Sequence, residues 1–128
     1  MKQITREWID KAEADWISAQ RMLRARKKPH YETVCFQAHE SAEKYLKARL
    51  QEAGVAFDRT LSLKKTMKLV FSVEPDWKSL PEDLSKLSPY TIDYLYPGKQ
   101  ANKAEAQDAI SRCRRIRDFI RTAFGLPV

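Results

Sequence analysis

The spacing of apolar residues in the first part of the chain predicts a long helix from about Thr5 to Arg26. Its apolar stripe consists of Trp8, Ala12, Ala19 and Met22, with Ile9, Trp16 and Leu23 beside them. Asp15 falls inside this stripe, three residues after Ala12. The helix is expected to close at the basic pair Lys27 and Lys28 before Pro29, because basic side chains suit the negative end of a helix dipole.

A second amphipathic helix is predicted from about Tyr31 to Ala53. Its apolar side is formed by Tyr31, Val34, Cys35, Ala38, Ala42, Tyr45, Leu46 and Ala53. A polar stripe runs along it through Gln37, Glu40, Lys44, Lys47 and Gln51. Gly54 follows directly and suits a helix C-terminal cap.

The remaining pattern predicts shorter helical segments and one further long helix. A third helix spans about Ser62 to Ser72, short helical pieces cover 81–87 and 89–95, and Tyr96-Pro97-Gly98 is a loop. The last helix begins at Asn102, with Glu105 at capping-box spacing, and ends at Gly125. The sequence therefore predicts one all-α domain over residues 1–128, an antiparallel up-and-down helical bundle with about five helices.

Composition adds a basic charge to this picture. The formal net charge is +7 and the pI is near 9.5, which fits either an anionic partner or ordinary solubilising charge. Cys35 and Cys113 fall on apolar helix faces and are expected to be buried reduced thiols. The sequence contains no membrane-length apolar run, signal region or metal-binding motif, so we expect a cytoplasmic protein without a cofactor or metal.

Two charged residues lie within apolar stripes, Asp15 in the first helix and Arg117 in the last. A charge in such a position must be paired or must lie at an opening in the fold. One interpretation is a structural ion pair between Asp15 and Arg117. The other places both residues in a polar pocket of the bundle.

The polar stripe of the second helix is the candidate ligand site. Lys44 and Lys47 lie one turn apart, so both ammonium groups are expected to approach one phosphate. Gln37 and Glu40 continue the stripe and are candidates to bind a base or ribose, and Tyr96 is a candidate stacking face. The alternative is that the lysines form surface ion pairs with carboxylates four residues earlier, which are Glu40 and Glu43.

Basic residues cluster in two other places. One cluster, at the end of the first helix, contains Arg21, Arg24, Arg26, Lys27 and Lys28. The other, along the last helix, contains Arg112, Arg114, Arg115, Arg117 and Arg121. Tyr90, Tyr94 and Tyr96 lie nearby in the sequence, and cations beside tyrosines suit nucleotides or single-stranded RNA. Solvated helix faces and core tyrosines are the alternative explanation.

Four segments in a fixed order resemble the HEPN domain family of small helical bundles. They are Trp8-x3-Ala12-x2-Asp15-x3-Ala19, Tyr31–Phe36 followed by Ala42-Glu43-Lys44-x2-Lys47-Ala48, Tyr96-Pro97, and the start of the last helix at 106–109. The resemblance covers the whole chain. It implies an antiparallel bundle, frequent dimerisation and an association with nucleotides or RNA, often beside a minimal nucleotidyltransferase in toxin–antitoxin pairs.

The ribonuclease members of this family carry an arginine followed four to six residues later by histidine in the later helical region. This chain has only His30 and His39, and neither lies there. Leu61 and Leu95 also replace a histidine and an arginine that the family often has. The resemblance therefore implies a non-catalytic, dimeric binding protein for a nucleotide or a nucleotidyltransferase. An RNA-cleaving toxin with an atypical active site is the alternative.

Overall fold

The computed structural model describes all 128 residues and contains α-helices and one 3₁₀ helix, with no strand. The elements are α1 (Gln3–Leu23), α2 (Tyr31–Ala53), α3 (Leu63–Val73), α4 (Pro81–Leu87), the 3₁₀ helix η1 (Ile92–Leu95) and α5 (Lys103–Ala123). The all-α prediction is therefore confirmed. The predicted helical piece at 89–95 is wrong in type and extent, since only a short 3₁₀ turn forms there.

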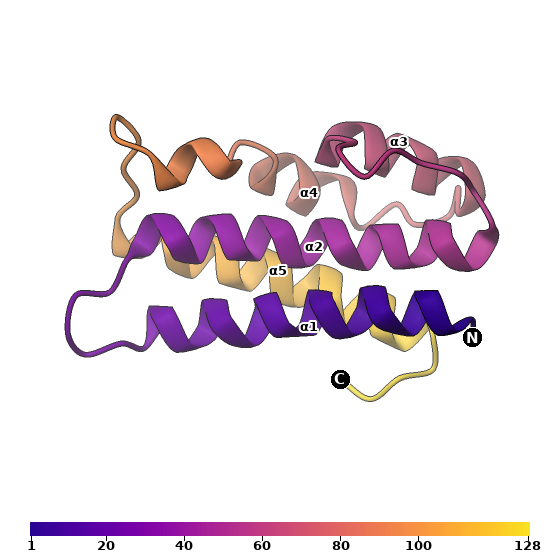
Figure 1. The fold of residues 1–128 in the computed structure, drawn as a ribbon, viewed down its shortest axis with the longest axis horizontal. Helices are drawn as coiled ribbons and strands as arrows, with labels where there is room; N and C mark the ends of the chain where they lie inside the picture. Colours follow the sequence, from indigo (N-terminus) through magenta and orange to yellow (C-terminus); the bar gives the residue numbers. More distant parts are fainter.

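The helices form a bundle in which α2 is the central element (Figure 1). Helices α1 and α2 make an antiparallel hairpin, and the segment containing α3, α4 and η1 returns along α2 on its other side. Helix α5 then packs against α2, α1 and α4. Residues 24–30 and the loop before α5 lie at the same end of the bundle (Figure 1).

Local signals set most helix ends. Asn102 and Glu105 form the predicted capping box, and Gly54 ends α2 in the left-handed conformation with φ 73°. Ser62 caps α3 by accepting a hydrogen bond from the Lys65 N–H. Helix α1 ends at Leu23, earlier than the predicted Arg26, and the connection to α2 includes Lys28 with φ 48°.

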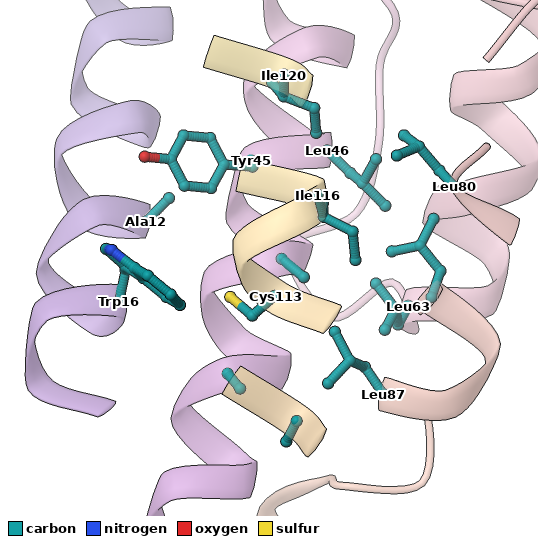
Figure 2. Packing of buried hydrophobic residues seen from close by; sticks show 14 of the residues in the cluster. Ala12, Trp16, Tyr45, Leu46, Leu63, Leu80, Leu87, Cys113, Ile116 and Ile120 are labelled. Carbon is teal, nitrogen blue, oxygen red and sulfur yellow. The ribbon is translucent and has the colours of Figure 1, made fainter. Parts of the chain in front are cut away.

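The core lies between α2 and the elements on both sides of it. Tyr45, Leu46, Ile116 and Ile120 are fully buried, and Leu80 and Leu87 close the core from the α3–α4 side (Figure 2). Small residues at Ala12, Ala19, Ala38, Ala42, Ala106 and Ala109 are also sealed from solvent. Their size allows the helix axes to approach closely, which fixes the positions of the polar side chains described below.

Both cysteines are buried and free, as predicted. Burial raises the pKa of Cys35 and that of Cys113 to about 12, so both remain protonated thiols at neutral pH. None of the helices combines the length and the apolar character needed to cross a membrane.

Candidate functional site

The predicted ion pair between Asp15 and Arg117 is wrong in its pairing. Arg117 donates to both carboxylate oxygens of Glu13, from Nε to Oε1 and from Nη2 to Oε2, each at 2.7 Å. Asp15 accepts a hydrogen bond from the Lys44 ammonium group instead. Residues two positions apart on a helix point about 200° apart, so Glu13 faces α5 while Asp15 faces α2.

The Glu13–Arg117 pair belongs to a structural cluster between α1, α2 and α5. Arg121 donates to the Tyr45 hydroxyl at 3.2 Å and lies 3.2 Å from Glu13, while the Arg117 guanidinium stacks 5.6 Å from the Trp16 ring centroid. Burial alone would raise the pKa of Glu13, but hydrogen bonding to Arg117 and the charge of Arg117 and Arg121 lower it below 4.5. Each charge in the cluster has a partner, which indicates a structural role.

The two lysines of the candidate phosphate site are held by different carboxylates. Lys44 bonds to Asp15 and lies 3.7 Å from Glu40. Lys47 is only 4% exposed, donates to Glu43 Oε1 at 2.8 Å and donates to the carbonyl of Arg59 at 3.1 Å. The expected four-residue pairs therefore form, but the second one is buried rather than at the surface. The two ammonium groups are thus not available to a common phosphate.

The other predicted ligand-binding residues are also not brought together. Gln37 is half-buried, and its Oε1 atom is sealed from solvent without a hydrogen-bond partner. Tyr96 is 62% exposed at the end of η1. None of Gln37, Glu40, Lys44, Lys47 and Tyr96 lines the groove described next.

A groove of about 430 Å³ lies directly beside the predicted stripe, between α2 and the segments 60–64 and 88–91. Seven of the ten lining residues have polar side chains, although apolar atoms make up most of the exposed lining; the residues are His39, Glu43, Thr60, Leu61, Ser62, Leu63, Lys64, Ser88, Pro89 and Thr91. Volumes of a few hundred cubic ångströms are typical of small-molecule sites. The groove is therefore the candidate functional site of the molecule.

His39 presents one ring nitrogen to this groove. Its Nδ1 atom lies 3.3 Å from Glu40 Oε1, and because a carboxylate only accepts hydrogen bonds, Nδ1 carries the proton in this contact. Nε2 makes no hydrogen bond within the protein and remains in reach of solvent, although His39 is only 5% exposed. On a neutral ring Nε2 is then a fixed hydrogen-bond acceptor.

Glu43 supplies a second fixed acceptor, one helical turn after His39. Its Oε1 atom accepts the Lys47 bond, which orients the carboxylate. Its Oε2 atom has no partner within the protein and stays in contact with solvent, while the residue as a whole is 9% exposed. Two mostly buried residues thus present unpartnered polar atoms to one groove.

Hydroxyl groups and one cation line the opposite wall. Ser62 and Thr60 come from the segment before α3, and Ser88 and Thr91 come from the segment after α4. Lys64 is exposed on the first turn of α3 and has no carboxylate partner. The hydroxyls of Ser62 and Thr91 can donate hydrogen bonds, and Lys64 offers one positive charge. The hydroxyls of Thr60 and Ser88 already donate to Asp58 Oδ1 and to the Ser85 carbonyl.

His39, Glu40 and Glu43 are the residues whose donor atoms could hold a metal ion, since these atoms lie within 4.8 Å of one another. Both carboxylates already interact with lysines, Glu40 with Lys44 and Glu43 with Lys47. A divalent cation would enter beside two ammonium groups and be repelled by both. The chemistry of the groove therefore fits an organic ligand with hydroxyl donors and an anionic group better than a metal ion.

From the sequence, Glu43 was assigned to a surface ion pair, and His39 was noted only as lying outside the region of the ribonuclease motif. The available signal was their spacing, because residues four apart on a helix share a face. What the sequence did not show is that segments 60–64 and 88–91 pack beside that face. The order of these segments along the chain does not indicate that they lie close together in the fold.

Comparison with known proteins agrees with this architecture. The crystal structure of TT1696 from Thermus thermophilus is similar over 94% of this chain and 98% of that chain, with a TM-score of 0.72 and 22% sequence identity. At this level of identity the likeness shows a common fold. No curated protein sequence matches the chain. The HEPN domain profile matches residues 5–123, which is nearly the entire bundle, and the chain therefore belongs to the HEPN domain family.

Proposed function

We propose that this HEPN-domain protein is a non-catalytic binding domain and that its ligand is a nucleotide held in the groove beside His39. The observation that carries the proposal is the pair of unpartnered acceptors, His39 Nε2 and Glu43 Oε2, on mostly buried side chains. Both atoms are within reach of water, and a ligand that donates hydrogen bonds would replace water at two acceptors whose positions the protein fixes.

The groove chemistry supports a defined orientation for such a ligand. Ribose hydroxyls donate hydrogen bonds and suit the acceptors on α2, while a phosphate suits Lys64 and the hydroxyls of the opposite wall. A volume of about 430 Å³ is sufficient for a mononucleotide. The proposed ligand is the same class as that predicted from the sequence, a nucleotide, but the residues proposed to bind it are different.

Removing the Lys64 charge should weaken the binding of AMP. A hydrogen bond to a charged group contributes about 1.5–3 kcal/mol, so Lys64→Ala is expected to raise the dissociation constant about 10- to 100-fold. Lys65→Ala is the matched control, because it removes the same charge from the next residue, which does not line the groove. Isothermal titration calorimetry with purified protein provides the measurement.

Adenosine separates the phosphate contact from the rest of the site. It lacks the phosphate, so Lys64→Ala should leave its affinity unchanged while His39→Gln and Glu43→Gln weaken both ligands. Equal loss of AMP binding in Lys64→Ala and Lys65→Ala would show that only net charge matters. That result, or undetectable AMP binding by the wild-type protein, contradicts the proposal.

RNA cleavage is the second candidate function, and one observation favours it. His39 is oriented by Glu40 and exposes Nε2 to the groove, which is the arrangement of a general base. Against it, no second histidine lines the groove to act as the acid, and the Glu43 carboxylate is paired with Lys47. We therefore expect no cleavage of a fluorogenic RNA substrate in the presence of EDTA. Cleavage that persists in Lys65→Ala and is lost in His39→Ala would instead establish the ribonuclease.

Self-association remains a prediction, with changed supporting residues. In the sequence, Trp8, Trp16 and Phe124 suggest a wide apolar surface on the first and last helices. Trp16 is only 5% exposed and Trp8 and Phe124 are half-buried, so this surface is largely internal. Ile4 and Ile17 of α1 are 43% and 41% exposed and are the better candidates for an interface. Sedimentation velocity at micromolar concentration is expected to show a dimer that Ile4→Asp or Ile17→Asp weakens, and a monomer at every concentration would refute it.

A minimal nucleotidyltransferase is the protein partner that we propose on the basis of family membership. The support is the association of many family members with such an enzyme. Co-purification of the tagged protein from its native host, followed by identification of the bound chain, tests this partner directly.

A further inference from the structure

We propose that one end of the bundle binds a single-stranded polynucleotide, at a surface separate from the groove. This surface, the cationic end, combines the connection between α1 and α2 with the loop before α5 (Figure 1). Its basic residues are Arg21, Arg24, Arg26, Lys27, Lys28, Lys99 and Lys103, and all of them are exposed. A hydrogen bond from the Ala101 N–H to Glu32 Oε2, at 3.2 Å, joins the loop to the start of α2.

The charge of the cationic end is not neutralised by the protein. None of its basic residues forms an ion pair, and the sequence contains no acidic residue between Asp15 and Glu32. The acids nearest the end are Glu32, Asp93 and Glu105, and Glu32 and Glu105 accept bonds from the backbone N–H groups of Ala101 and Asn102.

Four arginines of α5, unlike the residues of the cationic end, are paired with carboxylates. Arg112 and Arg115 bond to Asp83, and Arg117 and Arg121 pair with Glu13. The fold uses these arginines to connect its helices. Of the two basic clusters recognised in the sequence, only the one at the cationic end is left largely free for a partner.

A contribution to the stability of the fold explains the positions of only some basic residues at the cationic end. Arg24 donates to the Gln20 carbonyl at 3.3 Å, and Arg21 lies in the last turn of α1, where a cation favours the helix dipole. Lys27 and Lys28 instead lie beyond α1 and shortly before α2, whose positive N-terminal end disfavours cations. Lys28 also adopts a left-handed backbone with φ 48°, a conformation that is unfavourable for a residue with a side chain.

Aromatic surface at the same end favours a polynucleotide over other polyanions. Tyr96 is 62% exposed and has no ring partner, while Tyr94 packs edge-on against Tyr90 and beneath the Lys99 ammonium group. Ile92 and Leu95 beside them are also exposed, at 56% and 46%. Single-stranded nucleic acids present both phosphates for cations and unpaired bases for stacking, and an acidic peptide lacks the repeated planar bases.

The test is fluorescence anisotropy with labelled oligouridylate and oligothymidylate of about twelve nucleotides, a length within the range of single-strand binding sites. The variant Arg26→Ser/Lys27→Ser/Lys28→Gly removes three positive charges and the left-handed lysine. Loss of three phosphate contacts should reduce the slope of log Kd against log salt concentration by about 2. At roughly 0.1 M salt, the affinity should fall by about 100-fold. Tyr96→Ser should weaken binding about 5- to 100-fold with the salt dependence unchanged.

The matched control is Lys65→Ser/Lys68→Ser/Lys78→Ser, which removes the same charge from exposed positions of α3 and of the loop before α4 that do not line the groove. We expect it to change affinity less than about threefold, because α3 and the loop before α4 lie toward the other end of the bundle from the α1–α2 connection (Figure 1). RNA bound more tightly than DNA identifies the ribose as a further contact, and equal affinity indicates recognition through phosphate and base alone. Both results support the proposal.

Three results would overturn it. They are no binding of either oligonucleotide, equal losses in the two triple variants, and displacement of the labelled strand by polyglutamate as readily as by unlabelled oligouridylate. The last result would identify the cationic end as a site for an acidic protein surface. Melting curves of all variants are included, and the Lys28→Gly change is expected to preserve stability because glycine adopts the left-handed conformation without strain.

Discussion

Replacing Lys47 with methionine should destabilise the protein by about 3–5 kcal/mol, the range for breaking a buried ion pair. The side chain of Lys47 is 4% exposed and that of Glu43 is 12% exposed, so water replaces little of the lost interaction. The variant leaves the Glu43 carboxylate and the Arg59 carbonyl without the ammonium donor. The melting temperature should fall by roughly 10–20 °C.

Lys44→Met is the matched control on the same helix. Lys44 is also a lysine that pairs with carboxylates. Its side chain is 26% exposed, and the side chains of Asp15 and Glu40 are exposed to nearly the same extent. Partly solvated pairs of this kind contribute about 1 kcal/mol or less. Equal losses of stability in Lys44→Met and Lys47→Met would contradict the assignment of Lys47 as a buried structural cation.

A second substitution distinguishes pairing from packing at Lys47. If the loss comes from the orphaned carboxylate, Lys47→Met combined with Glu43→Leu should recover most of the stability, since apolar replacements of whole buried pairs are often nearly neutral. The double variant should still lose AMP binding, because Glu43 Oε2 is one of the proposed acceptors. Because replacing Lys47 lowers the stability of the fold, a variant with changes at both Lys44 and Lys47 would not separate a loss of ligand binding from a loss of folding.

Arg117→Met should have the second-largest effect, a loss of about 2–3 kcal/mol at neutral pH. It removes both hydrogen bonds to Glu13, while Arg121 remains 3.2 Å from that carboxylate and limits the loss. Arg114→Met is the matched control, because the Arg114 guanidinium also lies 5.4 Å from the Trp16 ring centroid but forms no ion pair. Urea denaturation of the three proteins provides the measurement.

The effect of Arg117→Met should depend on pH in a defined direction. Arg117 and Arg121 hold the pKa of Glu13 below 4.5 despite its burial, so the unfolded chain takes up the proton first as the pH falls. The stability from the ionised carboxylate is present above pH 4.5 and is lost as the pH falls through the lower folded-state pKa. The difference in stability between wild type and Arg117→Met should therefore narrow as the pH falls below 4.5. A gap that stays constant with pH would exclude Glu13 as the origin.

The helices and their caps were predictable because their signals are local. Bond patterns such as the Asn102–Glu105 capping box and the Gly54 C-terminal cap involve residues within a few positions of each other. The short segment at 92–95 was mispredicted because it is too brief to show a helical period, and its contacts with α2 decide its shape. Which charges face each other was predicted less well, since Asp15 was assigned to Arg117 and binds Lys44.

Periodicity and composition were enough to predict the helical bundle, its approximate element boundaries, the burial of both cysteines and the excess of positive charge. Periodicity and composition are properties of the sequence itself and do not depend on how the helices pack. Three features became visible only once the helices were packed: Lys47 is buried, four of the five α5 arginines are paired, and His39 and Glu43 line a groove made from three separate segments. The reason is that desolvation and ion pairing depend on which helix faces meet, and that choice is made by packing across the whole core.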